Sequence, residues 1–356
     1  MDNINSKTFK PENYWNEFEY SKLKLLLHPE KVQSVFSLLK HEKSFDEFPP
    51  VSIELHLTDR CNLRCSWCTD KLLRSRASDC SVEKIKKLFD YCRKNDVGVT
   101  LEGGGEPLIH PDFAEIVLYG SKIGLDMGLI SNGTINLSSL IVHFKWVRIS
   151  VDAASESEYL IEKGVDKYNI VMENLKNYSR TRKPETTHLG IGYVLTSRNM
   201  SNLENLMTYL NSIYIDYAYL RPVEEAAEIT PKIQALLEIK KLALAFNDKN
   251  RMQMLININE RLIKSNDSLP CVAHSLSCII HANGDVVLCE KRRHDKVIFG
   301  NIRDNSFEEI WNSQARKIAS QKLLVPESQH GCDVCRITSF NRAFCDLNKI
   351  HTRNFI

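Results

Sequence analysis

Three cysteines stand close together in the run Cys61-Asn-Leu-Arg-Cys65-Ser-Trp-Cys68. Structural zinc sites and simple iron–sulfur electron carriers normally take four protein ligands. Three thiolates with no fourth beside them therefore favour a 4Fe–4S cluster that keeps one iron open for a ligand that is not protein. A zinc knuckle, or unrelated thiols of a reducing cytosol, is the simpler interpretation, and the flanking sequence argues against it.

Two predicted strands frame this loop. Residues 51–57 alternate in character and predict a strand that enters the cysteine loop. Residues 97–102 predict a second strand, which runs into the Gly-rich segment 103–106. Glycines there permit positive φ and a close approach of the backbone to a ligand, and Glu106 adds an acceptor for a cationic group.

These motifs together resemble the radical S-adenosylmethionine (SAM) superfamily. The resemblance implies that the open iron binds the amino and carboxylate groups of SAM and that reductive cleavage yields a 5′-deoxyadenosyl radical. It also implies that Gly104, Gly105 and Glu106 bind the SAM amino group. Trp67 stands where the family usually has an aromatic residue near the adenine, although an ordinary packing role fits that position equally well.

Strands and helices alternate through the first two thirds of the chain, which predicts an α/β fold with a partial (β/α)6 TIM-like barrel. A small C-terminal domain of β-hairpin and helix is expected to bind a second cluster. We expect an N-terminal helical extension (1–50), the radical SAM barrel (51–224), a helical connector (225–265) and a SPASM/twitch-type auxiliary cluster domain (266–356). The expected strands are 51–57, 97–102, 125–130, 146–151, 188–195 and 214–220; the expected helices are 81–94, 112–122, 137–143, 155–179 and 201–212.

Ligands of such barrels lie at the carboxyl ends of the strands. Polar or small residues at those ends are therefore predicted to line the SAM site: Asn132, Ser150, Asp152 and Gly192. Arg221, at the end of the sixth strand, is predicted to face the SAM carboxylate or a substrate. For each of them, a turn residue or a solvated charge is the alternative.

A second set of cysteines lies in the C-terminal region. Asn283-Gly284 predicts a tight hairpin between two β-like runs, 277–282 and 285–289, and a helical segment spans 306–321. The pattern resembles the auxiliary cluster extensions of radical SAM enzymes, SPASM and its shorter twitch version, and zinc is the alternative. The resemblance favours one auxiliary 4Fe–4S cluster held by Cys271, Cys289, Cys332 and Cys335. Cys278 and Cys345 are possible substitutes, and Cys80 and Cys92 are expected to be structural.

Composition also bears on the binding partners and the compartment of the protein. The 356 residues carry 47 basic and 45 acidic side chains, so nothing draws the protein to nucleic acid or to an anionic membrane. No apolar run approaches the roughly 18–20 residues of a spanning helix, and no signal peptide is evident at the N-terminus. Eleven cysteines without an export signal favour a cytoplasmic protein that uses thiolates as metal ligands.

The resemblance implies a radical SAM oxidoreductase that abstracts hydrogen from its substrate, with a flavodoxin or ferredoxin as reductant. A fully ligated auxiliary cluster can accept the second electron, so we expect first the dehydrogenation of a small hydroxylated or sugar-like metabolite. Arg221, His281 and the run 291–294 are the candidates for substrate binding or proton handling. The alternative is a peptide or protein maturase that forms a thioether, an epimer or a formylglycine.

Overall fold

The computed structural model describes residues 23–73, 77–256, 258, 269–289, 297–325, 335 and 337–351. Cys332 and the run 291–294 lie outside these residues, and so do residues 1–22 of the expected N-terminal helical extension. One ten-stranded sheet in the order β10-β9-β8-β1-β2-β3-β4-β5-β6-β7 organises the described chain. Its strands are β1 (Ser52–Leu55), β2 (Gly98–Leu101), β3 (Met127–Ser131), β4 (Trp146–Ser150), β5 (His188–Leu195), β6 (Tyr217–Pro222), β7 (Gln253–Ile256), β8 (Ser277–Ile280), β9 (Asp285–Val287) and β10 (Ile298–Asn301).

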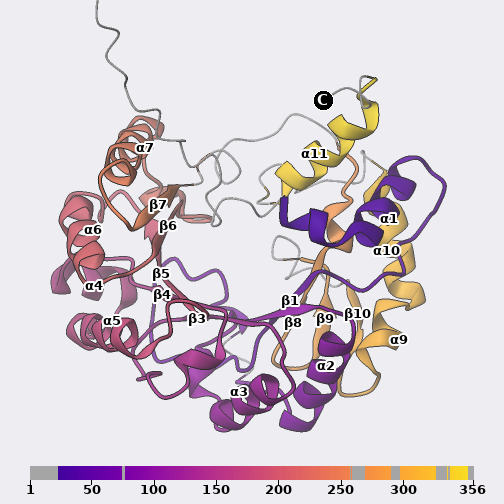
Figure 1. Ribbon diagram of the computed structural model, residues 1–356, viewed down its shortest axis with the longest axis horizontal. Helices are drawn as coiled ribbons and strands as arrows, with labels where there is room; N and C mark the ends of the chain where they lie inside the picture. Colours follow the sequence, from indigo (N-terminus) through magenta and orange to yellow (C-terminus); the bar gives the residue numbers. More distant parts are fainter. Residues whose placement is uncertain are drawn as a thin grey trace, which may run out of the picture.

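Helices follow most of the parallel strands and cover the outer side of the curved sheet (Figure 1). The helix predicted over 137–143 is only a short 3-10 turn at Ile141–His143, and the helix predicted over 155–179 is two helices separated at Gly164. The α-helices are α1 (Pro29–Leu39), α2 (Val82–Lys94), α3 (Phe113–Lys122), α4 (Glu156–Lys163), α5 (Tyr168–Thr181), α6 (Leu203–Ser212), α7 (Ile233–Asn247), α9 (Phe307–Trp311), α10 (Gln314–Leu324) and α11 (Thr338–Lys349).

The sheet is the open, partial α/β barrel that the sequence predicts, with one strand more than expected. Strands β1 to β7 are parallel neighbours in chain order. The segment 225–265, which we expected to be a helical connector, supplies helix α7 and also strand β7, which pairs with β6. The prediction was therefore incomplete at this edge of the barrel.

The auxiliary region continues the same sheet on its other edge. Strand β8 pairs in parallel with β1, with Ser52 opposite Ser277, and the predicted hairpin turns antiparallel through β9 and β10. Gly284 has a φ of 91° in the hairpin turn, as the Asn-Gly pair predicts. The first cysteine loop, after β1, and the hairpin that precedes Cys289 are therefore attached to one continuous sheet.

Side chains alternate between the two faces of the barrel strands. Ile53, Leu55, Val147 and Ile149 point toward the helices and belong to the main buried core. The intervening side chains, such as Arg148, therefore lie on the opposite, concave face of the sheet. This alternation separates a structural face from a face that is available for chemistry.

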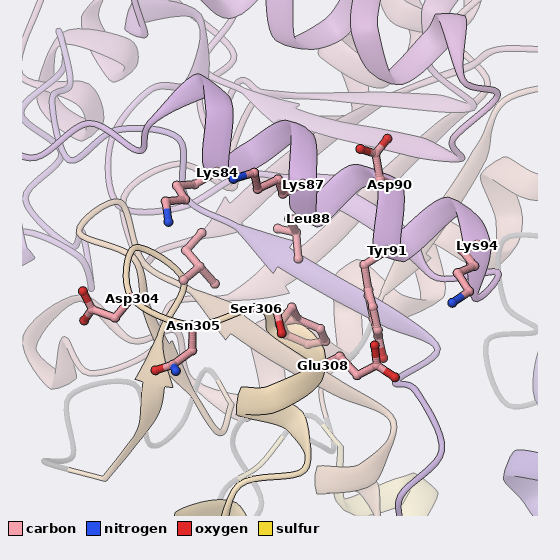
Figure 2. A pocket seen from close by; sticks show the side chains of 12 residues that line it. Lys84, Lys87, Leu88, Asp90, Tyr91, Lys94, Asp304, Asn305, Ser306 and Glu308 are labelled. Carbon is pink, nitrogen blue, oxygen red and sulfur yellow. The ribbon is translucent and has the colours of Figure 1, made fainter.

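Helix α2 also contacts the auxiliary region on the outer side of the barrel. A pocket of about 430 Å³ lies between α2 and the segment that joins β10 to α9 (Figure 2). Tyr91 packs edge-on against Phe307, with ring centroids 5.1 Å apart, and the Lys84 ammonium donates to the carbonyl oxygen of Arg303 at 2.5 Å. Because the pocket adjoins the outer helix, it is separate from the concave face.

None of the helices in the described part of the chain is long and apolar enough to cross a membrane.

Candidate functional site

The loop that follows β1 carries three half-buried thiols, Cys61, Cys65 and Cys68. Burial raises the pKa of the Cys65 thiol to about 11, the Lys163 ammonium opposes this shift, and the other two cysteines add to it. These mutual electrostatic effects mean that the three sulfur atoms lie near one another. Without a bound metal, the Cys65 thiol is therefore protonated at neutral pH.

The Gly-rich segment after β2 lies directly on the cysteine loop. The backbone N–H of Gly105 donates to the carbonyl oxygen of Thr58 at 2.8 Å, and that of Glu106 donates to Arg60 at 2.8 Å. A Cβ atom on Gly105 would come within 1.9 Å of the Arg60 carbonyl oxygen, so only glycine permits this approach. The two motifs that are separate in the sequence thus form one backbone unit.

Glu106 places a buried carboxylate beside this unit. It accepts hydrogen bonds from the Ser131 hydroxyl at 2.8 Å and from the backbone N–H of Asn132 at 2.7 Å. Burial raises its pKa above the ordinary value of a glutamate, although these hydrogen bonds oppose the shift. The Asn132 amide in turn donates to the Asn62 side chain at 2.7 Å, which ties the end of β3 to the cysteine loop.

The C-terminal end of α4 holds the other side of the cysteine loop, and the sequence did not indicate this contact. The Arg64 N–H donates to the carbonyl oxygen of Lys163 at 2.9 Å. Gly164 follows with a φ of 71°, and a Cβ atom there would lie 2.8 Å from the Arg64 carbonyl oxygen. A Lys-Gly pair in the middle of a long predicted helix was the available signal for a helix end.

Lys163 forms a buried ion pair with Asp152. Burial favours a lower pKa for Lys163, but the Asp152 carboxylate more than offsets this effect, and the pKa is raised. The ammonium also lies 5.2 Å from the ring centroid of Trp67. Asp152, which we predicted to line the SAM site, thus has its carboxylate occupied by Lys163 and by the N–H of Val194.

Trp67 is fixed by a second buried acid, Glu162. Its indole N–H donates to the Glu162 carboxylate at 2.9 Å, and the same carboxylate accepts from Thr196 and Arg198 at 2.9 and 3.0 Å. The ring also packs against a small apolar cluster that includes Val194. Trp67 is therefore a positioned side chain at the edge of the cysteine loop, which is compatible with both of its proposed roles.

The remaining predicted residues of the SAM site lie on the concave face. Ser150 ends β4 opposite Gly192 of β5, and within the described residues its hydroxyl makes no hydrogen bond. Arg221 lies on β6, and its guanidinium is 3.8 Å from the Glu224 carboxylate, so it is only loosely paired. These three residues lie near the strand ends, and within the described residues no hydrogen bond joins them to Glu106.

His281 lies in the auxiliary hairpin and meets a partner from the barrel. Its Nδ1 atom is 3.3 Å from Nδ1 of His56, and the two buried rings are arranged edge to face. The ring of His56 also occupies the space beside Gly103, where a Cβ atom would come within 2.1 Å of Nε2. The pair therefore joins the hairpin to the Gly-rich loop.

Three of the four predicted auxiliary ligands are in the described chain. Cys271, Cys289 and Cys335 are half-buried, whereas Cys278 and Cys345 are buried. Burial raises the pKa of Cys278 far above its ordinary value, because its side chain faces the main core. Cys80 and Cys92 are also buried in that core, as expected for structural cysteines.

The three thiols of the first loop are the donor type that iron–sulfur clusters take. Among the residues that the structure describes, no three His, Cys, Asp or Glu side chains converge on one metal ion. A cubane cluster is held by thiolates at separate corners, so its ligands need not converge on one point. The three thiols of the first loop, with the buried Glu106 beside them, therefore suit a three-coordinated cluster and a cationic co-ligand.

Comparison with known proteins identifies the class. Residues 55–210 match the Radical SAM superfamily, and residues 271–336 match SPASM, an iron–sulfur cluster-binding domain. The chain belongs to the radical SAM superfamily and carries a SPASM domain. It is accordingly a radical SAM enzyme. Its cofactors are SAM, a SAM-binding 4Fe–4S cluster and auxiliary iron–sulfur clusters in the SPASM domain.

Two curated relatives and one solved structure illustrate the likeness. The chain is 23% identical over 327 residues to the mycofactocin maturase MftC of Mycobacterium tuberculosis, covering 85% of this chain and 80% of the relative. It is 22% identical over 290 residues to the tungsten-containing aldehyde ferredoxin oxidoreductase cofactor-modifying protein of Pyrococcus furiosus, covering 73% and 80%. Streptococcus suis SuiB bound to its precursor peptide SuiA shares the fold, with a TM-score of 0.63 at 13% identity over 90% and 78% of the two chains.

Proposed function

We propose that this enzyme is a maturase that modifies a residue of a peptide or protein. The likeness to MftC and to the Pyrococcus cofactor-modifying protein, over four fifths of each relative, carries the proposal. SuiB, which shares the fold, has a peptide bound. None of these relatives favours the small-molecule dehydrogenation that we expected first, whereas they agree with the alternative.

In this proposal the residues around the cysteine loop hold SAM. Cys61, Cys65 and Cys68 would ligate the first cluster, which together with SAM supplies a radical that abstracts hydrogen. The Glu106 carboxylate accepts the SAM ammonium, and its burial strengthens that charge-assisted hydrogen bond. Trp67, held in place by Glu162, would lie near the adenine of SAM.

Strands β4 and β5 would hold the rest of SAM. The Ser150 hydroxyl offers a hydrogen-bonding group on the concave face near the strand ends, and Gly192 opposite it leaves room for the adenine. Asp152 acts indirectly, since its carboxylate positions Lys163 under Trp67. Cys271, Cys289, Cys332 and Cys335 would ligate an auxiliary cluster, with Cys332 outside the described residues.

The first experiment counts iron after anaerobic reconstitution. Two cubane clusters require about eight irons per chain, and the triple variant Cys61→Ala/Cys65→Ala/Cys68→Ala should retain about four. Cys92→Ala is the matched control, because that thiol is buried in the core and should leave the iron count unchanged. A triple variant that keeps the full iron content would contradict the assignment of the first cluster.

The second experiment tests the substrate class. The reconstituted enzyme is reduced, supplied with SAM and incubated with deuterated peptides encoded beside its gene. We expect 5′-deoxyadenosine that contains deuterium and a peptide of altered mass. If small hydroxylated metabolites transfer deuterium and no peptide does, the enzyme is the dehydrogenase that we expected first and not a maturase.

A further inference from the structure

Arg148 lies on the concave face of the barrel, below the proposed SAM site. Its neighbours in β4, Val147 and Ile149, are buried in the core on the helix side, so the Arg148 side chain projects to the other face. A Cβ atom on Gly192 would lie 3.7 Å from the Arg148 stem, which places the stem across strand β5. Arg148 precedes Ser150 by two residues and is therefore about 7 Å deeper along the strand.

Two aromatic rings lie close to the guanidinium of Arg148. Its central carbon is 5.6 Å from the ring centroid of Trp146 and 5.2 Å from that of Tyr219. The Trp146 ring is itself held close to the backbone of Gly128, where a Cβ atom would come within 2.2 Å of it. Cation–π contacts of this kind fix the plane of a guanidinium but leave its N–H groups unused.

The half-buried guanidinium has no acceptor within the part of the chain that the structure describes. Arg148 forms neither an ion pair nor a hydrogen bond there. It contacts the two rings, and its charge also opposes the rise that burial causes in the pKa of the nearby Tyr217 hydroxyl. Two other arginines of the described chain do have acceptors: the buried Arg182 donates to Asp216, and the exposed Arg198 donates to Glu162 at 3.0 Å. A positioned fork of N–H donors on a concave face is a preformed site for a planar anion.

We infer that Arg148 binds a carboxylate of the substrate. A carboxylate matches the guanidinium fork with two parallel hydrogen bonds, and the flanking rings exclude water and strengthen them. The inference rests on the proposed function, since a peptide brings carboxylates either at its C-terminus or on acidic side chains. With its carboxylate at this depth, the substrate extends toward the strand ends, where SAM is held in the proposed function.

Chemical labelling tests this site without measuring turnover. The reconstituted protein is treated anaerobically with phenylglyoxal, which modifies arginine, and the labelling rates of Arg148 and Arg180 are followed by mass spectrometry. The probes are N-acetylglycine, the α-amide of N-acetylaspartate and N-acetylglycinamide, which carry a terminal, a side-chain and no carboxylate. Arg180 is exposed on α5 and serves as the internal reference.

We expect a carboxylate probe to slow the labelling of Arg148 about threefold at about twice its dissociation constant, since two thirds of the sites are then occupied. The rate at Arg180 should not change. If only one of the two carboxylate probes protects Arg148, the result shows whether the substrate carboxylate is a C-terminus or an acidic side chain. Equal protection by N-acetylglycinamide, or no protection by any probe, overturns the inference. Protection of Arg148 by SAM alone also overturns it, because the ligand is then the SAM carboxylate.

Variants provide an independent readout. Arg148→Gln should weaken binding of the protective carboxylate by at least about tenfold, Arg148→Lys by less, and Arg180→Gln not at all. If Arg148→Gln does not fold, the labelling of the natural protein still decides the question. Failure of every peptide in the deuterium-transfer experiment would refute the maturase assignment while leaving protection of Arg148 intact, so the two proposals can fail separately.

Discussion

Replacing Lys163 by methionine should destabilise the protein strongly, because it breaks a buried ion pair. The side chains of Lys163 and Asp152 are only 2% and 1% exposed, so solvent does not screen their charges. Without the ammonium, the Asp152 carboxylate keeps the N–H of Val194 as a donor but loses its counter-charge. The chain then carries an uncompensated buried charge next to the cysteine loop.

The expected loss is about 3–5 kcal/mol, the range typical for removing one partner of a buried pair. Asp152 has a φ of 57°, which asparagine tolerates, so Asp152→Asn removes the charge without adding backbone strain. The double variant Lys163→Met/Asp152→Asn contains neither charge. It should therefore be more stable than the Lys163→Met variant despite carrying one substitution more.

Guanidinium unfolding of the metal-free protein under reducing conditions measures these differences. The control is Lys87→Met, whose partner Glu83 is 72% exposed, and we expect no measurable change there. A loss below about 1 kcal/mol for Lys163→Met would put the pair in the range of surface ion pairs and refute the reasoning. The reasoning would also be refuted if the double variant lost the sum of the free energies lost by the two single variants.

Three further predictions concern the SAM site and the auxiliary region. Glu106→Gln should weaken SAM binding to the cluster-loaded protein about 10- to 100-fold, measured by calorimetry, and an unchanged affinity would remove Glu106 from the site. Gly105→Ala should lower the free energy of unfolding by about 1–3 kcal/mol, because the added Cβ atom meets the Arg60 carbonyl. Gly98→Ala is the control and should leave it unchanged, since no neighbour lies closer than 3.9 Å to a Cβ atom there. Burial lowers the pKa of His274 to about 4. Between about pH 6.5 and pH 4, the imidazole is therefore protonated in the unfolded chain but neutral in the folded protein. The free energy of unfolding should therefore fall by about 3 kcal/mol between pH 6.5 and pH 4. In unfolding measured as a function of pH, His274→Gln should lose less stability over this range. The same pH profile for the variant and the natural protein would contradict the role of His274.

The sequence predicted the parts of the site that depend on local spacing. A strand before Cys61 and another before Gly103 place both loops at the same edge of a parallel sheet, and the backbone contacts of Gly105 and Glu106 with the cysteine loop agree with that expectation. Strand β5 was predicted over the residues that it occupies, because its apolar run is long.

Contacts that arise only in the folded chain were not predictable. Strand β7 has four residues, too few for a clear periodic signal, and a preceding helical pattern dominated the expectation for 225–265. The partnership of Lys163 with Asp152, and that of His56 with His281, joins residues from different elements. The local sequence around each of these residues does not indicate which residue it will contact.

The pairing of β1 with β8 sets an order for biosynthesis. Strand β1 leads directly into the cysteine loop, yet one of its two neighbours is made only when the ribosome reaches residues 277–280. Until then β1 presents an open edge, which is a template for association with other chains. Because pairing of such distant segments forms slowly, we expect the nascent barrel to stay open to aggregation longest at the strand that leads into the cysteine loop. A chain truncated after the barrel would keep that edge permanently, so the SPASM segment covers the edge of the strand that leads into the cysteine loop.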